Sequence, residues 1–144
     1  MATGAEKTQG MIDLLRTWQG IERKAMEQTA EIIEKTDNPF LRIIMEVIRH
    51  DSLMHHRVQQ TIVDSMTRGA ISLTSEEIAS IWSMIEAHDE TEKDVIKIAK
   101  QLREQAFTPI HRLLFDYLLG DEEKHDSLLE QLGEVKKELA RATQ

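Results

Sequence analysis

Two similar stretches of the chain decide its fold. Residues 38–62 read NPFLRIIMEVIRHDSLMHHRVQQTI, and residues 108–132 read TPIHRLLFDYLLGDEEKHDSLLEQL. In each stretch a capping residue and a proline precede apolar residues spaced three and four apart, which predicts an amphipathic helix that begins at the proline. Each apolar stripe is interrupted near its middle by an aspartate and, four residues later, by a histidine: Asp51 and His55, then Asp121 and His125.

The rest of the chain predicts two further helices of similar length. Thr74-Ser75-Glu76-Glu77 has the pattern of a capping box and predicts a helix start. We therefore expect helices over about 8–36, 39–67, 75–105 and 109–140, each roughly 45 Å long at about 1.5 Å per residue. Four such helices with short connections predict an all-α protein. We expect a single four-helix-bundle domain over 1–144, built from two similar helical hairpins at about 8–67 and 75–140.

The connection between the two hairpins bears on topology. About eight residues span at most roughly 28 Å, which is shorter than one of the helices. Either the flanking helices fray and lengthen the loop, or the bundle has up-down-up-down connectivity.

Composition excludes several classes of protein. The 144 residues include 18 Lys+Arg and 26 Asp+Glu, a net charge of −8, which argues against nucleic-acid or anionic-membrane partners. There is no Cys, so disulfides, thiolate metal sites and thiol catalysis are excluded. Neither a signal peptide nor a run of 18 apolar residues is visible, and we expect a cytoplasmic protein.

The two hairpins superpose at an offset of 70 residues. Apolar positions match, for example Ile48 with Leu118 and Val58 with Leu128, as any two amphipathic hairpins would. Polar residues at core positions also stay in register, which is harder to obtain by accident. They are Glu22 with Glu92, Asp51 with Asp121, and His55 with His125.

These six residues are expected at one level of the bundle. Glu22 lies 15 residues before position 37 and Asp51 lies 14 after it, and Glu92 and Asp121 have the same spacing about position 107. Buried carboxylates are costly unless they are paired, protonated or bound to a cation. Two divalent cations would balance four carboxylates, and oxygen and imidazole ligands suit iron(II), manganese or zinc.

With these residues the chain resembles the ferritin-like superfamily of di-iron carboxylate proteins, which includes rubrerythrins and bacterioferritins. The resemblance covers essentially the whole chain. It implies that Glu22 and Glu92 are single glutamate ligands and that His55 and His125 end Glu-x-x-His motifs. Glu122-Glu123-Lys124-His125 fits that motif as written, so Glu122 rivals Asp121, whereas the helix over 39–67 has Ser52 where the motif needs Glu. Otherwise Glu123, Lys124 and Asp126 are interpreted as a solvated face.

The resemblance implies a protein that binds two iron ions and reacts with oxygen or peroxide, in the manner of a ferroxidase or peroxidase. Manganese or zinc are alternative metals. Because the chain has no Cys, any electron-transfer module is expected on a separate redox partner. His50, His56 and His88 lie near the same level, either as partners of the site or as surface residues.

Two other functions remain open. In a metal-free interaction or structural protein, the polar layer would fix helix register through buried hydrogen bonds. A hemerythrin-like oxygen or metal binder would share the up-down-up-down topology, and His88-x-x-x-Glu92 is the fragment that fits it. Additional apolar residues on the helix over 39–67 predict a second buried face and a homodimer: Ile43, Met45 and Val47.

Overall fold

The computed structural model describes residues 1–142 of the chain, and these residues are helical almost throughout. Four helices follow one another: α1 (Gly4–Lys35), α2 (Pro39–Thr67), α3 (Ser75–Gln105) and α4 (Pro109–Ala142). The all-α class is confirmed. The expected boundaries agree within two residues except at the start of α1, which begins four residues earlier than position 8.

Capping side chains explain where the helices begin. The Thr74 hydroxyl accepts a hydrogen bond from the Glu77 N–H and the Glu77 carboxylate accepts one from the Thr74 N–H, each over 3.1 Å, so the expected capping box is confirmed. The Asn38 side chain caps α2. Thr3 and Glu6 form a second capping box, which starts α1 earlier than the apolar pattern indicates.

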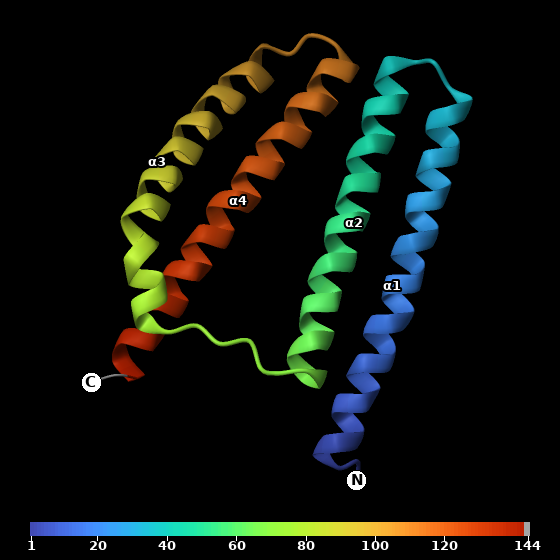
Figure 1. Ribbon diagram of the computed structural model, residues 1–144. Coiled ribbons are helices and arrows are strands. Elements are labelled where there is room, and N and C mark those ends of the chain that lie inside the picture. Colours follow the sequence, from blue (N-terminus) through green and yellow to red (C-terminus); the bar gives the residue numbers. More distant parts are fainter. Residues whose placement is uncertain (143–144) are drawn as a thin grey trace. The chain divides into compact units, whose positions relative to one another are not determined.

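The chain divides into two compact units, Met1–Ile71 and Ser72–Gln144. The first contains α1 and α2 and the second contains α3 and α4, each pair running side by side as a hairpin (Figure 1). These are the two helical hairpins that the bundle prediction requires. The connection between them covers residues 68–74, so the helices on either side do not fray to lengthen it.

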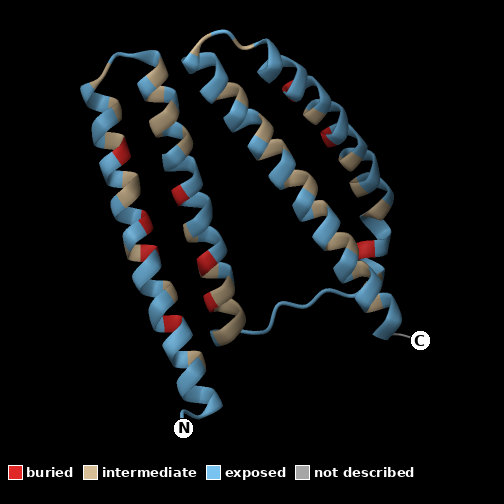
Figure 2. Ribbon diagram, turned by 180° about the vertical axis from the view of Figure 1, so that it is seen from behind, coloured by how far each residue is buried: buried red, intermediate tan, exposed pale blue. Residues whose placement is uncertain are grey.

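The buried residues of the first hairpin are largely polar, whereas those described in the second are Ile78, Glu92 and Ala99. Figure 2 shows the buried residues of α1 and α2 on the sides where the two helices face each other. Four buried residues of the described chain are apolar: Ile12, Val63, Ile78 and Ala99. The other buried residues are polar or charged: Gln19, Glu22, Thr29, Ser52, Gln59 and Glu92.

The apolar residues of each hairpin lie mainly on its exposed side. On α1 they are spaced three and four apart and include Leu14, Trp18 and Ile21; on α2 they include Ile48 and Val58. Corresponding stripes run along α3 and α4. Such a stripe is the surface that a helical hairpin buries when a four-helix bundle forms.

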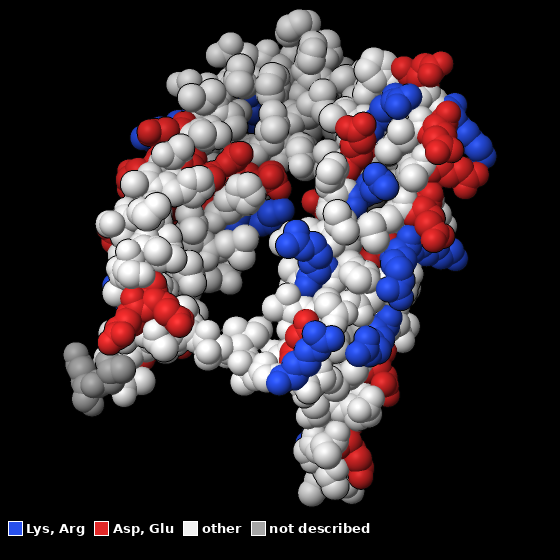
Figure 3. Space-filling model, viewed as in Figure 1, with Lys and Arg blue, Asp and Glu red and all other residues white. Residues whose placement is uncertain are grey.

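The outer side of α1 carries charges of both signs. Figure 3 shows Lys and Arg side chains interspersed with Asp and Glu along this helix.

Within residues 1–142 no helix combines the length and the apolar character needed to cross a lipid bilayer.

Candidate metal centre

Three potential metal ligands meet in the second hairpin. Glu92 comes from α3, and Glu122 and His125 come from α4, where their three-residue spacing places them on one face of the helix. One ligand atom from each residue lies within 4.8 Å of the others. This arrangement is the Glu-x-x-His motif of α4 facing the single glutamate of α3.

Glu92 is the buried member of the group. Its residue is only 6% exposed, and its Oε1 lies 2.8 Å from His88 Nε2 and 3.6 Å from His125 Nδ1. With Glu122 ionised, the Oε2 of Glu92 is buried with no hydrogen-bond partner. A buried carboxylate oxygen normally has a partner, so this atom has coordination capacity that the surrounding side chains do not use.

The two carboxyl groups of this cluster perturb each other. A hydrogen bond from Glu122 lowers the pKa of Glu92, and the same interaction, together with burial, raises the pKa of Glu122. In physical terms the two carboxylates repel each other, so ionising both costs more free energy than ionising one. A divalent cation between them would remove that repulsion.

The His125 ring connects this cluster to Asp121. Its Nδ1 lies 3.7 Å from Glu122 Oε2, while its Nε2 lies 3.5 Å from Asp121 Oδ2. Asp121 also contacts the Lys124 ammonium over 2.8 Å. The structure thus brings Glu122 rather than Asp121 into the group with Glu92. Asp121 lies on the opposite side of the imidazole, where a carboxylate can fix the ring orientation and tautomer of a metal-binding histidine.

The first hairpin holds a sparser version of the same arrangement. Glu22 is 7% exposed, and its Oε1 accepts a 3.0 Å hydrogen bond from Trp18 Nε1. The same oxygen lies 3.3 Å from His55 Nδ1. Asp51 and His55 are exposed, while Ser52 is buried against the partner helix. Glu22 and His55 are therefore brought together, with Trp18 as a partner that the sequence did not indicate.

The second hairpin contains a further acidic pair that the sequence pattern did not predict. Asp89 and Asp126 lie next to each other, and each has a buried Oδ1 with no hydrogen-bond partner. Their contact lowers the pKa of Asp89 and raises the pKa of Asp126. Asp126 is half-buried, so its interpretation as part of a solvated face is wrong. The pair could have been found by asking where the two hairpins differ, because Asp89 replaces Gln19 at the 70-residue offset.

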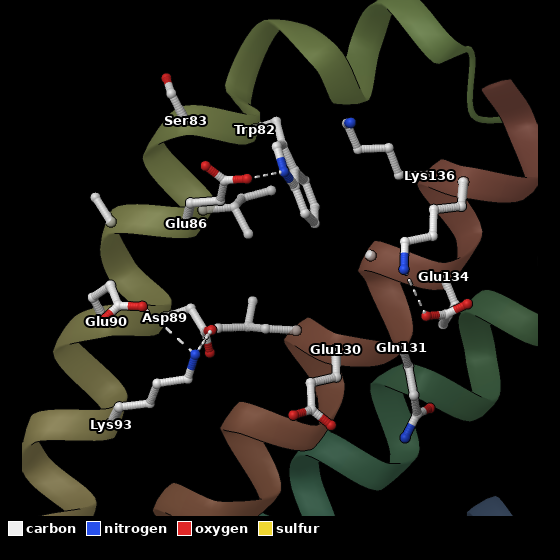
Figure 4. Close-up of a pocket in the computed structure, with 15 residues that line it drawn as sticks. Trp82, Ser83, Glu86, Asp89, Glu90, Lys93, Glu130, Gln131, Glu134 and Lys136 are labelled. Carbon is white, nitrogen blue, oxygen red and sulfur yellow. Dashed lines mark hydrogen bonds and ion pairs between the residues drawn. The ribbon is translucent and has the colours of Figure 1, made fainter.

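A groove of about 950 Å³ lies beside this acidic pair, between α3 and α4. Figure 4 shows Trp82 on its α3 wall, hydrogen-bonded to Glu86, and Lys93 between Asp89 and Glu90. At the offset of 70, Gln19 takes the place of Asp89 and His56 takes the place of Asp126, and Gln19 Nε2 donates to the His56 carbonyl oxygen over 3.3 Å. There Gln19 donates to Gln60 Oε1 over 3.0 Å.

The expected ligands thus separate into two groups, one in each hairpin. Glu22 and His55 meet in the first, and Glu92 and His125 meet in the second together with Glu122. A single metal centre that contains all six expected ligands would need residues from both hairpins, and it stays a prediction. Comparison of the chain with protein-family models, with curated proteins and with solved structures finds no match.

Proposed function

We propose that this chain is a metal-binding protein of the di-iron carboxylate kind. One observation carries the proposal: the buried, unpartnered Oε2 of Glu92 in a group that includes Glu122 and His125. Glu92, Glu122 and His125 would hold one divalent ion. The two carboxylates match its charge, and the imidazole supplies a neutral ligand.

The donor set favours some metals over others. Carboxylate and imidazole ligands without thiolate suit iron(II) and manganese, and they also accept zinc. Asp121 beside His125 Nε2, and His88 beside Glu92 Oε1, would hold these ligands in place. The first hairpin would supply ligands to a second ion through Glu22 and His55, with Asp51 on the same face of α2 as His55.

When two iron(II) ions are bound, they can supply two electrons to oxygen or hydrogen peroxide, so the proposed reaction is ferroxidase- or peroxidase-like. The chain's own residues would bind the ions, balance their charge and orient the imidazoles. Re-reduction would need a separate redox partner, because the chain contains no Cys for a sulfur-bound iron centre. We also propose a homodimer, which is supported by the apolar Ile43 on α2, exposed in the hairpin.

A metal-free interaction protein is the second candidate, and one observation favours it. In the first hairpin several polar side chains are hydrogen-bonded without a metal, Trp18 to Glu22 and Gln19 to Gln60. Both side-chain polar atoms of the buried Gln59 have no hydrogen-bond partner. Buried polar layers of this kind can specify helix register and partner choice.

Metal content distinguishes the two candidates. The protein is loaded with iron(II) under anaerobic conditions, desalted and measured by inductively coupled plasma mass spectrometry. We expect about two iron ions per chain, in accord with the charge of four carboxylates, and their loss in a His55→Ala/His125→Ala double variant. His111→Ala, near the start of α4, is the control and should retain the metal. A wild-type protein that keeps no iron, manganese or zinc refutes the proposal and leaves the interaction protein.

A chain that binds iron should also react. Anaerobically loaded protein mixed with oxygen or peroxide should consume the oxidant in proportion to bound iron(II), measured with an oxygen electrode or by the loss of peroxide. Bound iron without such consumption would refute the oxidoreductase part of the proposal and leave metal binding standing.

A further inference from the structure

The two hairpins carry the same core glutamate but surround it differently. At the offset of 70, Trp18 takes the position of His88, and each donates to the glutamate four residues further along its helix. Trp18 Nε1 lies 3.0 Å from Glu22 Oε1, and His88 Nε2 lies 2.8 Å from Glu92 Oε1. The geometry is conserved between the hairpins, while the group in contact changes from an imidazole to an indole.

The second difference is the loss of one carboxylate. At the offset of 70, Ser52 of the first hairpin corresponds to Glu122 of the second. Ser52 is buried, with 6% of its surface exposed. In the second hairpin, ligand atoms of two carboxylates and of His125 therefore lie within 4.8 Å of one another. In the first hairpin Glu22 has His55 beside it, and the position of the second carboxylate is taken by Ser52.

The glutamate Oε1 of each hairpin has two nitrogen neighbours, but the chemistry of one neighbour differs. Glu22 Oε1 accepts from Trp18 and faces His55 Nδ1. Trp18 is a donor only, so its indole cannot become a metal ligand as an imidazole can. An ion that binds through Glu22 Oε1 must displace the indole hydrogen bond, whereas the neighbour of Glu92 Oε1 is the His88 imidazole, which can itself bind a metal.

From these differences we propose that the hairpins bind divalent ions unequally: the second hairpin takes the first ion tightly, and the first hairpin takes the second ion weakly. This inference rests on the proposed metal-binding function and adds an order of loading to it. Glu92, Glu122 and His125 form the tight site. Glu22 and His55 form the weak site, whose affinity is limited by Ser52 and Trp18.

The expected difference in affinity is at least about tenfold. Loss of a group that merely orients a metal ligand lowers affinity by about 10- to 100-fold, and the first hairpin lacks a direct carboxylate ligand. The order follows from charge as well, because Glu92 and Glu122 lie together beside His125, whereas Glu22 is in contact with His55 and Asp51 is exposed on α2.

Titration of the full-length chain with Mn²⁺ tests the inequality, with free Mn²⁺ followed by electron paramagnetic resonance. Wild-type protein should show one tight and one weak site per chain. Glu122→Ser gives the second hairpin the residue of the first and should abolish the tight phase, while Glu123→Ser, its neighbour, should leave both phases unchanged. Ser52→Glu places a carboxylate three residues before His55 and should strengthen the weak phase by about tenfold or more.

Trp18 provides an independent report on the order of binding. The chain has two Trp, so Trp82→Phe leaves Trp18 as the single indole. In a titration with Zn²⁺, which is not paramagnetic, the fluorescence of Trp18 should stay constant through the first equivalent and change during the second.

The outcomes separate this inference from the function on which it rests. Absence of any bound Mn²⁺ or Zn²⁺ overturns the proposed function itself. Two sites of equal affinity in the wild type overturn the inequality and leave metal binding intact. A change in Trp18 fluorescence during the first equivalent overturns the order of loading. If Ser52→Glu does not fold, Glu122→Ser and the fluorescence titration still decide the question.

Discussion

Replacing Glu122 by Gln should stabilise the metal-free protein, although it should destroy the tight metal site. Glu92 and Glu122 are two carboxyl groups with ligand atoms within 4.8 Å of each other, and Glu92 is almost fully buried. In the absence of a cation this arrangement costs free energy, because the pair either repels or must take up a proton. Gln keeps the size and hydrogen-bonding capacity of the side chain and removes the charge.

The separation gives the size of the effect. At 4.8 Å two unit charges repel by about 1 kcal/mol in bulk water and by about 3 kcal/mol at an effective dielectric constant near 20. The Glu122 side chain is 24% exposed, so water screens part of this repulsion. We therefore expect Glu122→Gln to raise the free energy of unfolding by about 1–2 kcal/mol near neutral pH.

The sign of the pH dependence follows from the raised pKa of Glu122. The folded protein binds this proton more tightly than the unfolded chain does, so wild-type stability falls as pH rises above the ordinary value of 4.5 toward the raised pKa. Below 4.5 both states are protonated at this group and its contribution vanishes. The advantage of the variant should consequently be largest near neutral pH and disappear as pH approaches 4.5.

Urea unfolding followed by circular dichroism, in the presence of a chelator and at several pH values, measures this difference. Glu123→Gln is the matched control, because it removes the same charge from the next, exposed position and should change stability little. Added Mn²⁺ should stabilise the wild type strongly and Glu122→Gln much less, because the variant keeps the weak site of the first hairpin alone. If Glu122→Gln instead destabilises the metal-free protein by about 1 kcal/mol or more, the two carboxyl groups support the fold and our account of the cluster is wrong.

Three further predictions concern other parts of the molecule. Asp126→Asn should remove the carboxyl group whose pKa is raised by Asp89. In urea unfolding the metal-free variant should therefore gain stability relative to the wild type as pH rises above 3.8. An unchanged dependence of stability on pH would contradict this. Thr74→Ala should remove the capping box of α3 and lower the free energy of unfolding by about 1 kcal/mol, and an unchanged urea midpoint would show that the cap is dispensable. Ile48→Asp, on the apolar stripe of α2, should destabilise the protein by about 3 kcal/mol if the stripe is buried in a bundle. Ile43→Asp should mainly shift the proposed dimer to monomer in size-exclusion chromatography, and equal effects of the two substitutions would refute the distinction.

Local rules explain how much of the fold the sequence predicts. Proline after a capping residue and the Thr74 capping box act over a few residues, so α2, α3 and α4 begin where they are expected. The start of α1 was missed because Thr3 and Glu6 extend the helix beyond its apolar periodicity. Periodicity reports which face is buried, whereas capping decides where the helix begins.

The pairing of the candidate ligands is predicted less completely. Register within each hairpin follows from similar distances to the turn: the glutamate lies 15 residues before it and the histidine 18 after it, a difference of about one helical turn. This is why Glu22 meets His55 and Glu92 meets His125. The choice between Asp121 and Glu122 depends on which of two adjacent side chains points toward α3, and a difference of one position is about 100° around a helix. Spacing along the chain does not resolve that rotation when both residues are acidic.

The sequence by itself determined the helical class, the four helices, and the repeat that carries glutamate and histidine at equal heights. These features depend on local capping and on periodicity, which are written in neighbouring residues. Only the tertiary structure decided which side chains meet. Glu122 lies in one group with Glu92, and Trp18 donates a hydrogen bond to Glu22. Asp89 lies against Asp126. Such contacts depend on the rotation of one helix against another and on side-chain direction, which are set by packing across the hairpin.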